Sequence, residues 1–130
     1  MENQFSRTEM LVGKDAVERL KGSKVAVFGV GGVGGYAVEV LARSGVGCID
    51  VFDADTVNIT NLNRQVIALH STLEQAKVDA IEKRIYDINP ACVIGKYKMF
   101  YLPENAGEVD LKQYDYVVDC IDTITAKIEL

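Results

Sequence analysis

Short runs of apolar and β-branched residues alternate along this chain with segments whose apolar residues recur at helical spacing. Four such runs predict strands, at residues 23–30, 48–55, 92–100 and 114–122. Between the first two runs, apolar residues from Val33 to Leu41 recur every three or four positions, which predicts a helix that Gly45 ends. Residues 6–22 predict one or two short helices before the first strand.

A longer amphipathic segment, residues 70–90, separates the second predicted strand from the third. Ser71 and Glu74 have the spacing of a capping box, so we expect the helix to begin there. Pro90 follows its end. One aliphatic stripe marks the face that we expect to be buried, formed by Val78, Ile81, Ile85 and Ile88.

Strands that alternate with helices predict an α/β fold, in which right-handed crossovers place helices on both faces of a mostly parallel, Rossmann-like sheet. Residues 1–22 are then an N-terminal helical segment, and residues 23–130 form the βαβ units. A further apolar helical pattern begins at residues 123–130. We therefore expect the N-terminal part of a larger domain, truncated at its C-terminus.

The composition narrows the class of protein. Of 130 residues, 48% are apolar and 25% are charged, as in ordinary globular domains. No apolar run approaches the roughly 20 residues of a membrane span, and the N-terminus lacks a signal-peptide pattern, so we expect a cytoplasmic protein without a membrane segment. The three cysteines lie far apart, which argues against a disulfide framework or a zinc site within this chain. A net charge of −5 disfavours a dedicated nucleic-acid-binding protein.

A glycine-rich turn follows the first predicted strand. Its sequence, "GVGGVG", matches Gly-x-Gly-x-x-Gly between a strand and a helix, where glycines permit a phosphate to approach the helix N-terminus. The glycines are Gly29, Gly31, Gly32 and Gly34. Asp53 ends the second strand, 24 positions after Gly29 (53 − 29), where a carboxylate can hold ribose hydroxyls. This pattern indicates an adenine nucleotide and fits NAD and ATP equally, with a plain glycine turn as the alternative.

The polar segment "VNITNLNRQV", residues 57–66, favours ATP over NAD. A triphosphate needs charge and hydrogen-bond donors spread over many oxygens, whereas a dehydrogenase needs a nicotinamide pocket. Arg64 can bind phosphate bidentately, and Asn61 and Gln65 can add directed hydrogen bonds. Asp53 and Asp55 directly precede the segment, and we count both among the cofactor-binding residues.

Two further positions fit an enzyme that uses ATP with Mg²⁺. Lys77 lies beside Val78 on the buried stripe of the long predicted helix, where its ammonium group can point at a phosphate. Asp119 and Asp122 end the fourth strand, at the carboxyl edge where open α/β sheets bind ligands, and one of them can hold Mg²⁺. The alternatives are a solvated helix lysine and a carboxylate that caps the next helix.

Together these motifs carry a resemblance. "GVGGVG", "DADTVNITNLNRQ", the spaced Lys77 and "DCIDT" resemble the ATP-dependent adenylating enzymes related to ubiquitin-activating enzyme, the ThiF/MoeB/HesA family, over nearly the whole chain. "FSRTEMLVG", "DINP" and "DCIDTITAKIEL" are similar to the branch formed by tRNA threonylcarbamoyladenosine dehydratases. Enzymes of that branch use ATP to activate the carboxylate of threonylcarbamoyladenosine in tRNA and close it to a cyclic form.

The resemblance implies a role for each matching residue. Asp53 would hold the ribose, and Asp122 would bind Mg²⁺. Arg7 matches an N-terminal arginine that reaches the nucleotide site of the partner subunit, which implies a homodimer; a mobile terminal residue is the alternative. The phosphate contacts would be Asn61, Arg64 and Lys77. The candidate catalytic residues are then Arg64, Lys77, Asp122 and Arg7.

The resemblance also implies the reaction. A carboxylate attacks the α-phosphorus of ATP to give an acyl-adenylate and pyrophosphate, and a nitrogen of the same substrate then closes a ring and releases AMP. The protein places the carboxylate in line and neutralises charge on the phosphates.

Three alternatives stay open. The first is activation of the C-terminus of a ubiquitin-like sulfur-carrier protein, which would make a sulfur-carrier or sulfur-relay protein the partner. The others are an NAD-dependent oxidoreductase and a non-catalytic nucleotide-binding dimerisation domain. The acidic net charge stands against tRNA as the substrate.

Overall fold

The computed structural model describes residues 2–100 and 106–121. Its strands are β1 (Lys24–Phe28), β2 (Cys48–Phe52), β3 (Val93–Tyr97) and β4 (Tyr116–Asp119). Its α-helices are α1 (Ser6–Val12), α2 (Lys14–Lys21), α3 (Gly32–Ser44) and α4 (Lys77–Ile88). Short 3₁₀ helices are η1 (Ile59–Asn61), η2 (His70–Thr72), η3 (Ala106–Glu108) and η4 (Leu111–Gln113). No helix in the described ranges is long and apolar enough to cross a membrane.

The strands form one parallel sheet in the order β3-β2-β1-β4. The order reverses at β1, and open α/β sheets bind their ligands at the carboxyl ends of the strands next to such a reversal. Phe28 pairs with Phe52 on one side and with Asp119 on the other. The glycine turn and the residues after β2 and β4 therefore leave the sheet at the same level.

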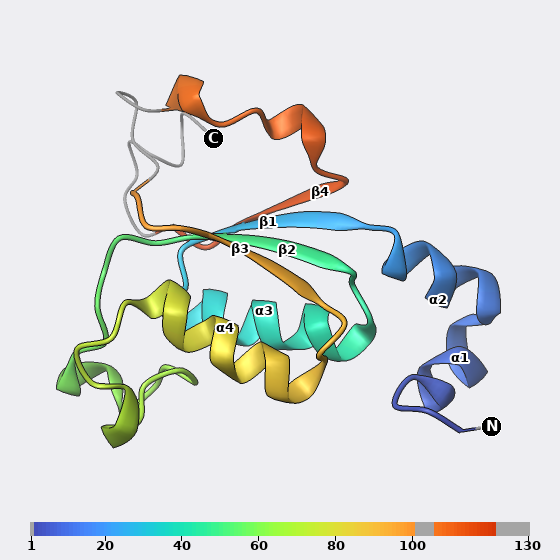
Figure 1. Ribbon diagram of the computed structural model, residues 1–130, viewed down its shortest axis with the longest axis horizontal. Helices are drawn as coiled ribbons and strands as arrows, with labels where there is room; N and C mark the ends of the chain where they lie inside the picture. The colour runs from blue at the N-terminus through green and yellow to red at the C-terminus, as the bar shows by residue number, and fades with distance from the viewer. Residues whose placement is uncertain (1, 101–105, 122–130) are drawn as a thin grey trace.

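The sheet is covered differently on its two faces (Figure 1). The helices α3 and α4 pack on one face, where the larger apolar core includes Val27, Val51 and Ile81. A smaller cluster around Phe28 and Phe52, whose rings stack at 4.3 Å, lies under η3, η4 and their flanking residues. The predicted Rossmann-like α/β fold is confirmed, although the cover on the second face consists of 3₁₀ turns within the described residues.

The predicted start of the long helix was wrong. The helix α4 begins at Lys77, whereas Ser71 lies in η2 and Glu74 has a left-handed φ of 68° that interrupts any helix. Long-range pairing has displaced the local capping signal, because Thr56 and Ala76 form an antiparallel bridge. The bridge folds residues 57–75 into a closed loop and brings the start of α4 to the end of β2.

The N-terminal residues are fixed at the opposite ends of the helices from the glycine turn. The Phe5 ring lies against Gly45, the left-handed residue that ends α3, and Gln4 Nε2 donates a 3.0 Å hydrogen bond to Ile88 O at the end of α4. Figure 1 shows α1 and α2 projecting from this side. The helix predicted at residues 123–130 lies outside the described residues.

Candidate functional site

The glycine turn after β1 is shaped by close backbone approach. Gly29 has φ +93°, and a Cβ added there would lie 2.5 Å from Cys120 O on the chain that leaves β4. A Cβ on Gly34 would lie only 1.6 Å from Gly29 O. Glycine is therefore required at both positions for the turn to close on itself and on β4.

The other two glycines leave the start of α3 open. Added Cβ atoms would meet only side chains at ordinary distance, Gln65 Nε2 at 3.5 Å from Gly31 and Arg64 Cγ at 3.9 Å from Gly32. No side chain in the described residues caps α3, so N–H groups of its first turn remain available. Such a helix start favours an anion, and here the side chains of Arg64 and Gln65 lie beside it.

Asp53 ties the glycine turn to β2. Its carboxylate is buried, with Oδ2 accepting from Val30 N–H and Oδ1 from Asp55 N–H, both at 2.8 Å. The side chain of Asp55 is exposed at the same edge of the sheet. The spacing in sequence pointed to a carboxylate for the ribose, but gave no sign that Asp53 also holds the turn. That Asp53 holds the ribose stays a prediction.

The polar segment after β2 is held by its own asparagines. Asn58 Oδ1 accepts from Thr60 N at 2.9 Å, and Asn61 Oδ1 accepts from Asn58 N at 2.8 Å, which together cap η1. Asn61 is buried, yet no hydrogen bond within the described residues uses its NH₂ group. Its amide therefore fixes the loop with the oxygen and keeps two donors for another partner.

Arg64 and Gln65 follow on the same loop. Arg64 Nη1 donates to Thr60 O at 3.2 Å and to Asn63 Oδ1 at 3.0 Å, and no carboxylate pairs with this exposed guanidinium within the described residues. Gln65 is buried against Gly31. Its Oε1 is the one buried side-chain polar atom within the described residues that lacks a hydrogen-bond partner. An unsatisfied atom beside the glycine turn is what a site completed by a ligand or ordered water leaves behind.

Lys77 brings a mostly buried side chain with a positive charge to this edge. It is the first residue of α4, only 6% exposed, and its backbone N–H donates to Asp55 O at 3.0 Å. No ion pair or hydrogen bond among the described residues uses its ammonium group, and its nitrogen is not among the buried atoms that lack a partner. The stem is therefore buried while the charge reaches the surface of this edge, where a compact cation can meet an anion.

The remaining predicted residues are not assembled here. Asp119 ends β4 with an exposed carboxylate whose Oδ1 accepts from Ile121 N at 3.0 Å, and Asp122 lies outside the described residues. No group of three or more metal-binding side chains occurs in the described ranges. Arg7 is exposed on α1, whose first turn is fixed at the far ends of α3 and α4. The structure therefore does not place Arg7 at the glycine turn of its own chain.

Two cysteines can be set aside as nucleophiles. Burial, with a smaller contribution from the nearby Cys48, raises the pKa of Cys92 to about 11. Burial and the charge of Asp50 also raise the pKa of Cys48. Both thiols are protonated near neutral pH and therefore unreactive. What the site offers is positive charge and hydrogen-bond donors that an anion can use.

The structure is a Rossmann-like domain whose glycine turn, with the open start of α3, lies beside Arg64 and Gln65. The sequence model of the ThiF family matches residues 5–130, and the chain belongs to that family, as its motifs indicated. The tRNA threonylcarbamoyladenosine dehydratase of Bacillus subtilis is 54% identical over 130 residues, covering 100% of this chain and 51% of that protein. The sulfur carrier protein adenylyltransferase of Thermus thermophilus is 35% identical over 116 residues, 89% of this chain and 42% of that protein.

Solved structures also include a tRNA threonylcarbamoyladenosine dehydratase that is similar to this chain. The crystal structure of the E. coli tRNA N6-threonylcarbamoyladenosine dehydratase in complex with ATP has a TM-score of 0.91 and 38% sequence identity to this chain. The match covers 98% of this chain and 52% of that one. The chain thus spans about half the length of the curated dehydratases that it matches.

Proposed function

We propose that this chain is the ATP-binding part of an enzyme that adenylates a carboxylate, the carboxylate of threonylcarbamoyladenosine in tRNA, and then closes it to a cyclic form. The unpaired ammonium of Lys77, at the edge where the glycine turn leaves the sheet, carries the adenylation proposal, because it supplies a charge that a phosphate would neutralise. The choice of substrate is supported by the dehydratases of Bacillus subtilis and E. coli, at 54% and 38% identity.

The residues around the glycine turn would divide the work on ATP. Arg64 would bind a phosphate bidentately, Lys77 would act as a compact charge, and the start of α3 would direct N–H groups at the same anion. Asn61 would donate its NH₂ group, while Asp53 and Asp55 would take the ribose. Fixed donors of this kind stabilise the charge that develops as the carboxylate attacks the α-phosphorus.

We also propose that Mg²⁺ binds at the carboxyl end of β4. Asp122 would hold the ion, with the exposed Asp119 as the other candidate. A magnesium ion needs few protein carboxylates, because phosphates and waters complete its shell, and it supplies charge neutralisation. The absence of a three-residue metal cluster in the described ranges is compatible with such a site.

Ring closure requires no nucleophile from the protein. A nitrogen of the substrate attacks the carbonyl carbon of the acyl-adenylate, the bond to the phosphate oxygen breaks and AMP leaves, so that the nucleoside loses one water overall. The protein's part is to hold both ends of the substrate together and to exclude bulk water. Because the proposed substrate is a tRNA, we place the protein in the cytoplasm.

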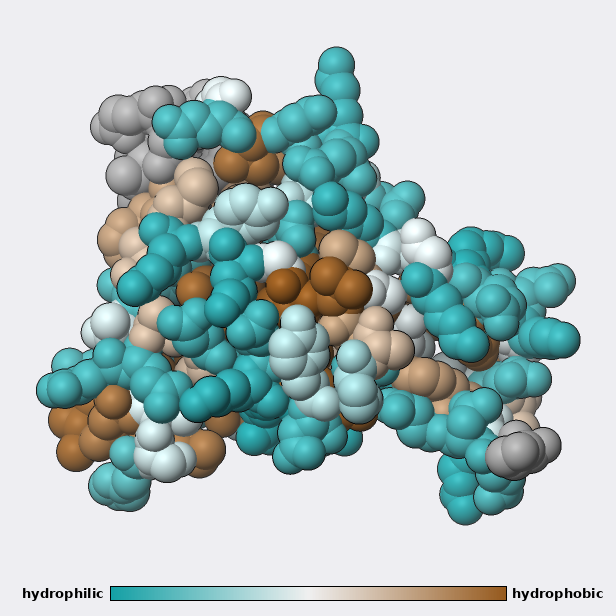
Figure 2. Space-filling model, in the orientation of Figure 1, coloured by the Kyte–Doolittle hydropathy of each residue, from teal (hydrophilic) through white to brown (hydrophobic). Residues whose placement is uncertain are grey.

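We also propose a homodimer in which Arg7 reaches the nucleotide site of the partner subunit. Three large apolar residues form an exposed stripe on α3 at helical spacing, with 74%, 52% and 61% of their surface accessible: Val33, Tyr36 and Val40. Apolar surface also gathers over the loop between β2 and α4, at the lower left of Figure 2. Ile59 of this loop is exposed. Surfaces of this kind mark protein contacts.

The substrate is tested by mass. The protein at its full natural length is incubated with ATP and tRNA that carries threonylcarbamoyladenosine, and the digested nucleoside should have lost one water. An unchanged nucleoside together with adenylation of a carrier protein that ends in Gly-Gly would favour the sulfur-carrier alternative, to which the Thermus relative at 35% identity points. Calorimetry that finds tighter binding of NAD than of ATP would contradict adenylation altogether.

A further inference from the structure

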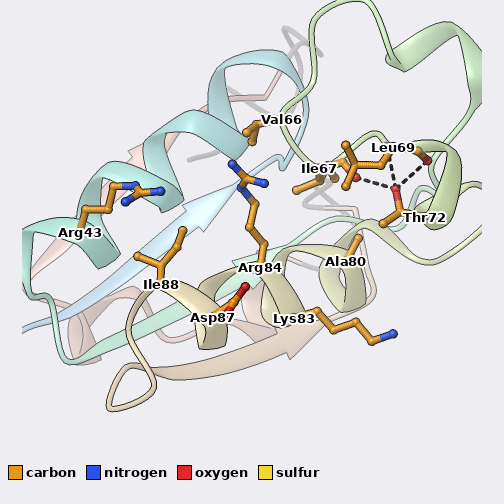
Figure 3. A pocket seen from close by; sticks show the side chains of 10 residues that line it. All are labelled: Arg43, Val66, Ile67, Leu69, Thr72, Ala80, Lys83, Arg84, Asp87 and Ile88. Atoms are coloured by element: carbon orange, nitrogen blue, oxygen red, sulfur yellow. Dashed lines mark hydrogen bonds between the residues drawn. The ribbon is translucent and has the colours of Figure 1, made fainter.

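Basic side chains gather at a groove outside the nucleotide site. A cavity of about 520 Å³ lies between α3, α4 and residues 66–72, and it contains none of the predicted site residues (Figure 3). Three of the chain's 14 basic residues line it, Arg43, Lys83 and Arg84, against one lining carboxylate, Asp87. Its floor is apolar. In a chain of net charge −5, these three cations still outnumber Asp87 and the adjacent Glu39.

One carboxylate holds two of these cations in place. Glu39 accepts from Arg84 Nε with one oxygen and from Arg43 Nε, at 3.3 Å, with the other. Burial would raise the pKa of Glu39, but the two guanidinium groups outweigh it and hold the pKa low. Both contacts use Nε, so the terminal NH₂ groups remain as donors. Figure 3 shows the Arg84 guanidinium extending across the groove towards Val66.

The third cation is unpaired. Lys83 is exposed on α4 and has no ion pair within the described residues, and Figure 3 shows its ammonium extending away from the apolar floor. Tyr86 follows on the same helix, 43% exposed and three positions further, so the two side chains are neighbours on the surface. A free cation beside an exposed aromatic ring suits a phosphate and a base.

We propose that this groove binds backbone phosphates of the tRNA next to the modified nucleoside. The inference rests on the proposed function. Val66, at one end of the groove, directly follows Arg64 and Gln65 at the glycine turn, so an RNA whose nucleoside reaches the adenylation site extends over the groove. Contacts to phosphates fix the position of a nucleic acid without reading its sequence. The groove would also let an acidic chain bind RNA locally.

The test compares paired charge deletions. Affinity for substrate tRNA is measured by fluorescence anisotropy at several salt concentrations, with the protein at full natural length. Arg43→Ala/Lys83→Ala should weaken binding about tenfold, and the slope of log affinity against log salt should fall by about 1.4 to 1.8, two phosphate contacts at about 0.7 to 0.9 each. The control Lys14→Ala/Lys112→Ala removes the same charge from exposed positions on α2 and η4 and should leave both values near wild type.

ATP affinity should be unchanged in every variant. The groove is not an RNA site if the groove variant keeps wild-type affinity and salt slope, or if the control loses as much affinity. The proposed function would still stand in that case, provided that the wild-type protein dehydrates the nucleoside. A wild-type protein that neither binds nor dehydrates the tRNA overturns both. Loss of binding to a carrier protein instead of tRNA would assign the groove to a protein. Should the double variant fail to fold, Lys83→Glu tests the same point at an exposed, unpaired residue.

Discussion

Lys77 carries a positive charge that residues 2–100 and 106–121 leave unpaired. Its backbone is fixed by the bond to Asp55 O, and the residue is only 6% exposed at the edge where the glycine turn leaves the sheet. Its ammonium nitrogen is not among the buried atoms that lack a partner, so the charge is not removed from water. Lys77 therefore need not destabilise the empty protein, and its charge is available to an anion at this edge.

Substitution of Lys77 by methionine should separate binding from stability. Lys77→Met keeps the length of the side chain and removes the charge, so Tm without nucleotide should stay the same or rise. ATP affinity should fall at least about tenfold, or about 1.4 kcal/mol, and the rise of Tm on adding ATP should shrink accordingly. Scanning calorimetry and titration calorimetry measure the two effects.

Lys83→Met is the matched control, because Lys83 lies on the same helix with its side chain exposed. It should bind ATP like the wild type. If Lys77→Met instead lowers Tm and binds ATP normally, Lys77 has a structural role and the phosphate assignment is wrong.

Within the polar loop, the three asparagines make different hydrogen bonds. Asn58 caps η1, and Asn63 Oδ1 accepts from the Arg64 guanidinium, so both act inside the loop. Asn61 shares this duty but keeps its NH₂ group unused within the described residues. The composition of the segment could indicate a phosphate-binding loop. It could not show which asparagine has which hydrogen bonds, because each bond depends on backbone turns that composition does not encode.

At the scale of helices and strands, the sequence predicts the elements that depend on local patterns of residues. The strands and α3 follow from apolar patterns and from Gly45, whose left-handed φ of 100° ends the helix as expected. The start of α4 depends on the pairing of Thr56 with Ala76 across a closed loop, which overrode the local signal at Ser71. The same pairing positions Lys77, so this candidate residue reaches the edge beside the glycine turn by a contact that the sequence did not reveal.

The glycine turn allows a paired prediction. Gly34→Ala places a methyl group 1.6 Å from Gly29 O, so α3 must shift, and the free energy of unfolding should fall by about 2 kcal/mol or more. Gly32→Ala meets nothing closer than 3.9 Å and should fold with near wild-type stability. Its methyl group lies beside Arg64 at the open start of α3, so ATP affinity should fall.

Urea denaturation and ATP titration of both variants check this pair. Equal stability of the two variants would mean that the turn is not packed as described. Unchanged ATP affinity in Gly32→Ala would move the phosphates away from the start of α3.

At the scale of the whole molecule, Arg7 lies far from the other proposed catalytic residues of its own chain. Arg64 and Lys77 belong to the edge at the glycine turn, whereas the start of α1 is fixed at the far ends of α3 and α4 by Phe5 and Gln4. The 13 residues of α3 separate these regions by roughly 20 Å, at about 1.5 Å per residue. A second copy packed on the exposed α3 stripe is the arrangement that would unite them.

A hybrid dimer tests this arrangement. Arg7→Ala and Lys77→Met subunits are co-expressed with different tags, and the hybrid is isolated by sequential purification. If Arg7 acts across the interface, one of the two sites combines its own Lys77 with Arg7 of the other subunit, and the hybrid should recover about half of wild-type ATP–pyrophosphate exchange. If Arg7 acts within its own chain, both sites of the hybrid are damaged and it should be as inactive as its parents.

The hybrid of Arg64→Ala with Lys77→Met is the control for this experiment. Both residues serve the site of their own chain, so each of its two sites lacks one phosphate contact and no activity should return. Recovery in this control would mean that subunits exchange more than the N-terminal helix. Full activity of the Arg7→Ala homodimer would remove Arg7 from the catalytic set, since a residue that neutralises charge on the phosphates cannot be deleted without loss of exchange.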